Sequence, residues 1–371
     1  MPHLFDIAVL GATPAGLAAA YALASRGCDV VVIDAPSQST ESPLCDWAPK
    51  DLFKLPGLPK TLIRDSGAGP FSAVAYYNAA LGKRVEHPSR GVAGYFVTAR
   101  DLAAALSDSA RHAGVRIQAS SISPELHLLE DHIESIGSTR IRARLLLAAQ
   151  NQPRDVIGEL ALPVRTLPHS ALVVAGLDVP IRPSAAKKLA GTLNIVELPE
   201  RSELGMFFAF DEMVHLRLIS ASSASGTRAA ELSGLLTSLQ AAGTLPGDLR
   251  LAKAKGAVWY PPAGVALELE SHVAKRCLLA GTAGGFAETI TGQTLYPSVK
   301  SALLACEVAL AALKARDVQE ALMAFKTSWR RGLADYLRPP NTSLRMLLPL
   351  LFVNQRILAK FTRALLYGEN I

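Results

Sequence analysis

Residues that could bind a phosphate group form a glycine turn near the start of the chain. Gly11 and Gly16 enclose Ala12-Thr13-Pro14-Ala15, and the turn follows the apolar run Phe5–Leu10. An alanine-rich run comes next, and a second apolar run ends at Asp34. Strand, glycine turn, helix, strand and acid in this order are typical of a βαβ unit that binds a dinucleotide. We expect the pyrophosphate on the first amides of the helix and the adenosine ribose at Asp34.

One position in this turn departs from the full glycine pattern. The middle glycine of G-x-G-x-x-G would stand at position 13, where this chain has Thr13. The backbone comes closest to the pyrophosphate there, so a side chain crowds or shifts the ligand. Pro14 suits the first turn of a helix. The alternative interpretation is an α/β fold that has kept the turn and lost the nucleotide.

A second glycine-rich stretch lies late in the chain. It follows the short apolar run Cys277–Ala280 and contains Gly281, Gly285 and Gly292. A long run of small and apolar residues then predicts a helix from Tyr296 to Leu313. The late stretch therefore repeats the order of strand, glycine turn and helix.

The remaining patterns predict an α/β fold that carries these turns. We expect a Rossmann-like nucleotide-binding domain with a parallel sheet over 1–160 and 256–315. Apolar, strand-like runs predict an inserted antiparallel β-sheet substrate domain over 161–255, which can include part of 70–98. Residues Val258 to Glu270 are expected to add a strand or two. Residues 316–371 predict a helical C-terminus, with helices at Val318–Tyr336 and Ser343–Tyr367, the second broken near Pro349.

Composition narrows the class of protein. The chain has 371 residues, half of them hydrophobic, and a net charge of +6. It is therefore long enough for two domains and too apolar to be disordered. The chain has no dense block of Lys and Arg, so we expect no nucleic-acid partner. The four cysteines form no C-x-x-C pair and no zinc spacing, so we expect no metal site. Asp6 interrupts any N-terminal apolar stretch, and we expect a cytoplasmic protein.

The C-terminal helix has a basic amphipathic pattern within residues 343–367. One face is apolar, and Arg356, Lys360 and Arg363 interrupt it. Such a helix can lie on a membrane surface, so peripheral membrane contact through 343–367 is one expectation. Packing of this face on the protein's own core is the alternative. The apolar positions are Ile357, Leu358, Phe361, Leu365 and Leu366.

The stretch from Gly281 to Ala302 resembles the motif G-D-A-A-G-F-x-x-P-x-x-G-x-G of geranylgeranyl reductases. Phe286 stands at the phenylalanine of that motif. Cys45 falls near the family's C-G-G-G motif, and Arg100-Asp101-Leu102 resembles its R-x-x-L/F-D segment. Over most of its length the chain resembles FAD-dependent oxidoreductases of the group that includes geranylgeranyl reductases and aromatic hydroxylases.

The resemblance implies FAD as the cofactor, hydride transfer from reduced flavin to a small apolar, isoprenoid-like substrate, and NAD(P)H as one electron donor that the family allows. It assigns a catalytic position to Cys45. A FAD-dependent aromatic-type monooxygenase is the alternative enzyme. The cofactor-binding residues that the resemblance implies are Gly11, Thr13, Pro14, Ala15, Gly16, Asp34, Arg100, Gly281, Thr282, Gly285, Gly292, Gln293, Thr294 and Leu295.

The chain departs from the family pattern at further cofactor positions. Thr282 replaces the aspartate that binds the ribityl chain, and Thr294 replaces the second glycine of G-x-G. Gln150 replaces the acid of the family's A-D-G segment. A neutral hydrogen bond is worth about 0.5–1.5 kcal/mol and a charged one about 1.5–3 kcal/mol. One such loss weakens FAD about tenfold and several abolish binding, so a non-catalytic protein that has lost FAD is the third hypothesis.

Overall fold

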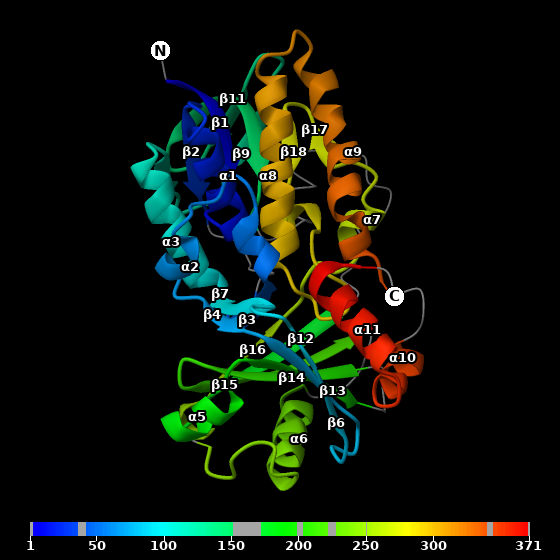
Figure 1. Cartoon of the computed structure of the whole chain (residues 1–371). Coiled ribbons are helices and arrows are strands. Elements are labelled where there is room, and N and C mark those ends of the chain that lie inside the picture. Colours follow the sequence, from blue (N-terminus) through cyan, green and yellow to red (C-terminus); the bar gives the residue numbers. More distant parts are fainter. Residues whose placement is uncertain are drawn as a thin grey trace.

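The computed structural model describes residues 3–35, 42–150, 172–198, 203–221, 228–249, 251–339 and 344–369. Figure 1 shows two main parts along its long axis. One holds the first strands with α1, α3, α8 and α9, and the other holds a second sheet with α5 and α6. The C-terminal helices α10 and α11 lie beside the second sheet.

The first sheet contains the predicted βαβ unit. Five of its strands are parallel neighbours in the order β18, β11, β1, β2 and β8. β17 extends it antiparallel at one edge, and the hairpin β9–β10 joins β11. This confirms the Rossmann-like parallel sheet. The bounds are β1 (Leu4–Leu10), β2 (Val30–Asp34), β8 (Arg116–Ala119), β9 (Glu125–Leu128), β10 (Ile133–Ile136), β11 (Arg140–Ala148), β17 (Val273–Ala274) and β18 (Cys277–Leu279).

Four helices cover this sheet and bury its apolar residues. Most side chains of α1 (Pro14–Ala24) are short, and the helix is almost wholly buried. It therefore packs closely against α3 (Ala99–His112) and α8 (Leu295–Ala312). α9 (Val318–Leu337) packs on α8. α8 is long and apolar enough to cross a membrane, but 72% of it is buried within the protein. It is the central helix of this part of the core.

The second sheet has seven strands in the order β16, β12, β15, β14, β13, β5 and β6. All neighbours are antiparallel except β13 and β5. The sheet contains strands from 73–88 as well as from 172–221, and its edge strand ends at Trp259. The bounds are β5 (Ala73–Tyr77), β6 (Arg84–Pro88), β12 (Leu172–Pro180), β13 (Thr192–Leu198), β14 (Glu203–Phe210), β15 (Met213–Ala221) and β16 (Lys255–Trp259).

A small third sheet lies between the two parts. It consists of β3 (Cys45–Pro49), β7 (Gly94–Thr98) and β4 (Gly69–Phe71) in that order. The remaining short elements are η1 (Lys50–Lys54), α2 (Leu62–Asp65), α5 (Pro183–Leu189), α6 (Arg228–Ala241), η2 (Leu251–Lys253), α7 (Val265–Glu268) and η3 (Gly281–Gly284).

One local expectation was wrong. Strand structure after Trp259 does not continue, because Pro261 and Pro262 precede Gly264, whose φ of +82° starts α7. The C-terminal helix is interrupted near Pro349, as expected: α10 (Leu344–Leu351) contains Pro349 and ends two residues after it. The chain becomes helical again where Asn354 accepts hydrogen bonds from the first amides of α11 (Gln355–Tyr367) and caps it.

Candidate cofactor site

Four neighbouring strands of the first sheet end at the same level. Leu10 pairs with Ile33 on one side and with Ala148 on the other, and Ala148 pairs with Leu279. Backbone hydrogen bonds continue this order one residue further, since Ala149 N–H donates to the Leu10 carbonyl over 2.9 Å. Both glycine turns and Asp34 therefore leave the sheet at one edge, the carboxyl ends of parallel strands, where α/β folds bind ligands.

The glycines at this edge are required by close backbone approach. Gly11 has a φ of +104°, and a Cβ there would lie 2.8 Å from the Cα of Gln150. Gly281 has a φ of +61°, and its Cβ would lie 2.9 Å from the Cβ of Ala15. Only glycine fits such positions without strain. The structure thus places the early and late glycine turns in contact, although 270 positions separate Gly11 from Gly281.

Thr13 is used to hold this arrangement together. Its Oγ1 accepts from the Gly16 N–H over 3.1 Å, which caps the N-terminus of α1. The same hydroxyl donates to the Ala149 carbonyl over 2.9 Å. One amide that the family turn offers to a pyrophosphate is therefore already bonded. Thr13, which stands in place of the middle glycine, therefore links the N-terminus of α1 to the residue that follows β11.

The adenosine side of the site, which we define as Gly11–Gly16, Asp34 and Arg100, combines a largely buried glycine turn with two exposed side chains. Asp34 ends β2 with its side chain exposed, and Arg100 is exposed in the first turn of α3. Within the described part of the chain, neither side chain makes a hydrogen bond or an ion pair. An exposed acid is thus available at the sheet edge from which α1 begins, as an adenosine ribose requires.

The ring side, which we define as residues 281–295, is enclosed by protein. Thr282 and Gln293 are at most 1% exposed, and Thr294 and Leu295 are 2% exposed. The Gln293 side chain donates to the Trp47 carbonyl over 3.2 Å and accepts from the Tyr336 hydroxyl over 3.4 Å. It therefore joins the late glycine turn to β3 and α9.

Glu288 fixes the conformation of the ring side. Its carboxylate accepts hydrogen bonds from the amides of Ile290 and Thr291 and from the Thr291 hydroxyl. Burial raises the pKa of Glu288 to about 7, and these donors act in the opposite direction. The Glu288 amide in turn donates to the Gln293 carbonyl over 2.9 Å. Both carboxylate oxygens are thus occupied by the loop itself.

Apolar side chains fill the space between the ring side and the second sheet. Trp47 is fully buried on β3, and Phe96 stacks on Phe208 with ring centres 4.2 Å apart. Trp259 and Ile290 belong to the same buried cluster. Any substrate or ring that enters this region meets an apolar wall.

The adenosine side and the ring side differ in how well their residues fit FAD. The adenosine side fits: its glycine cradle, Asp34 and Arg100 can hold the adenosine diphosphate portion. The ring side does not fit as it stands, because Thr282, Gln293 and Thr294 offer neutral groups that already pack within the protein. We therefore derive no reaction step through a flavin ring.

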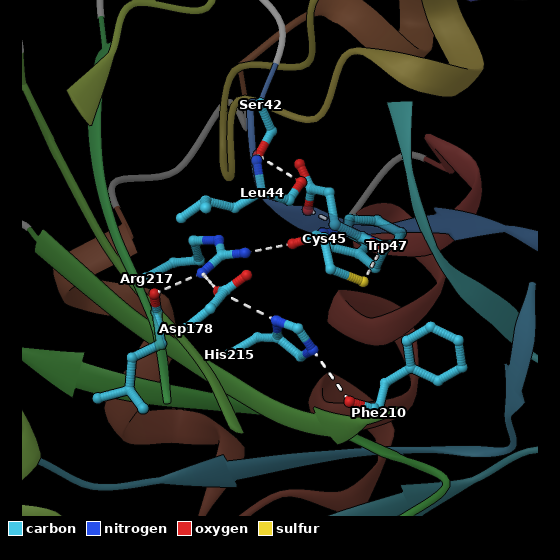
Figure 2. A network of polar contacts seen from close by, with 10 residues as sticks. Ser42, Leu44, Cys45, Trp47, Asp178, Phe210, His215 and Arg217 are labelled. Carbon is cyan, nitrogen blue, oxygen red and sulfur yellow. Dashed lines mark hydrogen bonds and ion pairs between the residues drawn. The ribbon is translucent and has the colours of Figure 1, made fainter. Parts of the chain in front are cut away.

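A buried polar network that the sequence patterns did not reveal lies beside this region (Figure 2). Arg217 is wholly buried; its Nη1 donates to Asp178 Oδ1 over 2.8 Å, and its Nη2 donates to the Cys45 carbonyl. His215 Nδ1 lies 3.0 Å from the same Asp178 oxygen. Burial raises the pKa of Asp178, but the His215 contact and the Arg217 charge outweigh it, so its pKa is lowered. The sequence indicates this network only through polar residues within apolar strands, namely Asp178 on β12 and His215 and Arg217 at alternate positions of β15.

Cys45 lies at this network rather than at an open site. It is buried on β3, and desolvation raises the pKa of its thiol well above the usual range despite the Arg217 charge. A thiolate is therefore disfavoured, although nucleophilic and redox chemistry needs one. The neighbouring Asp46 is also buried, and burial raises its pKa to about 6. These properties are those of core residues that attach β3 to the second sheet.

No protein-family model and no curated protein sequence matches the chain. Solved structures do match. A geranylgeranyl bacteriochlorophyll reductase-like protein from Thermoplasma acidophilum has a TM-score of 0.72 at 16% identity and covers 100% of this chain and 98% of its own. The p-nitrophenol 4-monooxygenase PnpA from Pseudomonas putida has a TM-score of 0.70 at 16% identity, covering 98% and 94%. The flavin-dependent halogenase CmlS has a TM-score of 0.71 at 14% identity, covering 93% and 67%.

These likenesses define the class of fold. The chain has the fold of flavin-dependent oxidoreductases, a group that here includes a reductase-like protein, a monooxygenase and halogenases. The match to the reductase-like protein extends over nearly the full length of both chains. Identities of 14–16% establish the fold, and the activity has to be argued from the site.

Proposed function

We propose that this protein is a FAD-dependent oxidoreductase of the reductase type that acts on a small apolar substrate. One observation carries the proposal: both glycine turns and Asp34 come to one sheet edge in a chain of flavoprotein fold. The adenosine side would hold the adenosine diphosphate portion of FAD through the amides of α1, the Asp34 carboxylate and the Arg100 guanidinium. With the ring side open, bound FAD would supply hydride transfer.

The chain's own residues define the rest of the proposed site. Trp47, Phe96, Phe208, Trp259 and Ile290 form an apolar wall that excludes water and favours an apolar substrate such as an isoprenoid chain. A flavin ring reaches this wall only if the contacts of Gln293 with β3 and α9 open. We therefore expect FAD uptake to be slower and weaker than adenosine diphosphate binding.

A second function is favoured by the closure of the ring side. In this alternative the protein keeps the fold, binds no flavin and has no redox activity. The burial of Thr282, Gln293, Thr294 and Leu295 and the hydrogen bonds of Gln293 support it. The two candidates differ in whether the ring side opens.

Absorption spectroscopy of purified and FAD-reconstituted protein separates the two candidates. The proposal expects a flavin band that remains with the protein after removal of free FAD, and bleaching of that band by NADPH or a ferredoxin-type donor. Bleaching by NADPH only when an aromatic substrate is present would identify a monooxygenase instead. Protein that stays colourless after reconstitution would reject both enzymes and leave the non-catalytic alternative.

A further inference from the structure

The C-terminal helix pair differs from the expected amphipathic anchor. The apolar face of α11 is buried: Leu358, Phe361, Leu365 and Leu366 pack in the same cluster as the inner face of the second sheet. The Tyr76 hydroxyl and Thr362 Oγ1 share a hydrogen bond of 2.9 Å. This face is therefore used by the protein itself and is not free for another partner.

The preceding helix, α10, is apolar on two sides. Leu347, Leu348 and Leu351 pack into the core with at most 6% of their surface exposed. Met346 is 67% exposed, and Val353, in the turn after the helix, is 76% exposed. A helix that only covers a core has a polar outer side, so this exposed apolar stripe indicates a second contact. The stripe comprises Met346, Leu350 and Val353, at helical spacings of four and three.

The charged residues within 344–367 are all basic. They are Arg345, Arg356, Lys360 and Arg363. Arg356 is exposed in the first turn of α11, three residues after Val353, and makes no ion pair within the described part of the chain. Arg363 pairs with Glu369 over 3.4 Å. Exposed aliphatic side chains with an exposed, unpaired arginine close by in the sequence complement an anionic lipid surface.

We propose that the stripe of Met346, Leu350 and Val353, with Arg356 beside it, docks this protein on the surface of an anionic phospholipid bilayer. The stripe enters the region between headgroups and acyl chains, and the cations contact lipid phosphates and carboxylates. The helix lies on the membrane and does not cross it. This inference does not depend on FAD binding, because α10 lies outside the adenosine and ring sides.

Vesicle sedimentation of the full chain tests the proposal. Phosphatidylcholine vesicles with phosphatidylserine should retain the wild type at low salt, and neutral vesicles or high salt should release it. The double variant Met346→Ser/Val353→Ser should lower the partition coefficient about tenfold or more, and Arg356→Gln should lower it several-fold. Met323→Ser is the matched control, because Met323 is 52% exposed on α9.

Three results would overturn the proposal: no retention by anionic vesicles, equal retention by neutral ones, or retention that the double variant leaves unchanged. If the wild type self-associates in size-exclusion chromatography and the double variant is monomeric without any loss of vesicle binding, the stripe is a contact between copies of the chain. The circular dichroism of each variant should equal that of the wild type, since the replaced side chains are exposed.

Discussion

Replacement of the buried arginine, Arg217→Met, tests how the second sheet is attached to β3. The wild-type guanidinium balances Asp178 at 2.8 Å and also binds the Cys45 carbonyl. Methionine has a similar length but leaves the Asp178 carboxylate buried without its cation. Loss of one partner of a buried pair costs about 3–5 kcal/mol, because the remaining charge is uncompensated. We expect a loss of this size in the free energy of unfolding.

The assay is urea unfolding followed by circular dichroism. The double variant Asp178→Asn/Arg217→Met should recover about 2 kcal/mol or more of the loss, because it contains no unpaired charge. Arg338→Met is the control: its exposed pair with Asp335 should be worth about 0–1 kcal/mol. If Arg217→Met loses no more than this control, or the double variant recovers nothing, the assignment of a buried ion cluster is wrong.

Three further predictions concern the same framework. The pKa of Asp46 rises from 3.8 to about 6 on folding. Its contribution to stability is therefore complete below pH 3.8 and falls by about 3 kcal/mol as the pH rises through 6. Asp46→Asn should flatten this dependence of the unfolding free energy on pH, measured by urea titrations at several pH values. Gly281→Ala should lose about 1–3 kcal/mol, since the new Cβ meets Ala15 at a positive φ, whereas Gly247→Ala, where a Cβ meets nothing, should change stability by less than about 1 kcal/mol in the same experiment. Thr13→Ala removes the cap of α1 and should lower the unfolding free energy by about 1–2 kcal/mol; an unchanged urea midpoint would show that the cap is dispensable.

Sequence patterns predicted the parts of the molecule that depend on local order. The unit from Phe5 to Asp34 is contiguous, and each of its residues has a role within one strand, turn or helix. The late turn at Gly281 was found in the same way, because a strand, glycines and a helix follow one another. Hydrophobic pattern also predicted most strands of the second sheet, whose alternation reflects its buried faces.

Contacts between distant residues could not be predicted in this way. Gln293 binds Trp47 across 246 positions, and no local pattern specifies that its amide turns inward. Asp178 faces His215, and Arg217 faces Gly176 two residues away, only once the register of β12 and β15 is set. These contacts decide that the ring side is closed, so they carry much of the functional argument.

Calorimetric titration with FAD tests the central claim most directly, namely that the edge formed by Gly11, Asp34 and Arg100 holds the adenosine diphosphate portion of the cofactor. We predict saturable FAD binding with which excess adenosine diphosphate competes. Asp34→Ala should weaken this binding about tenfold or more, whereas Asp335→Ala, on the exposed surface of α9, should leave it unchanged. No heat of binding with FAD or adenosine diphosphate, or equal affinities of wild type and Asp34→Ala, would contradict the claim.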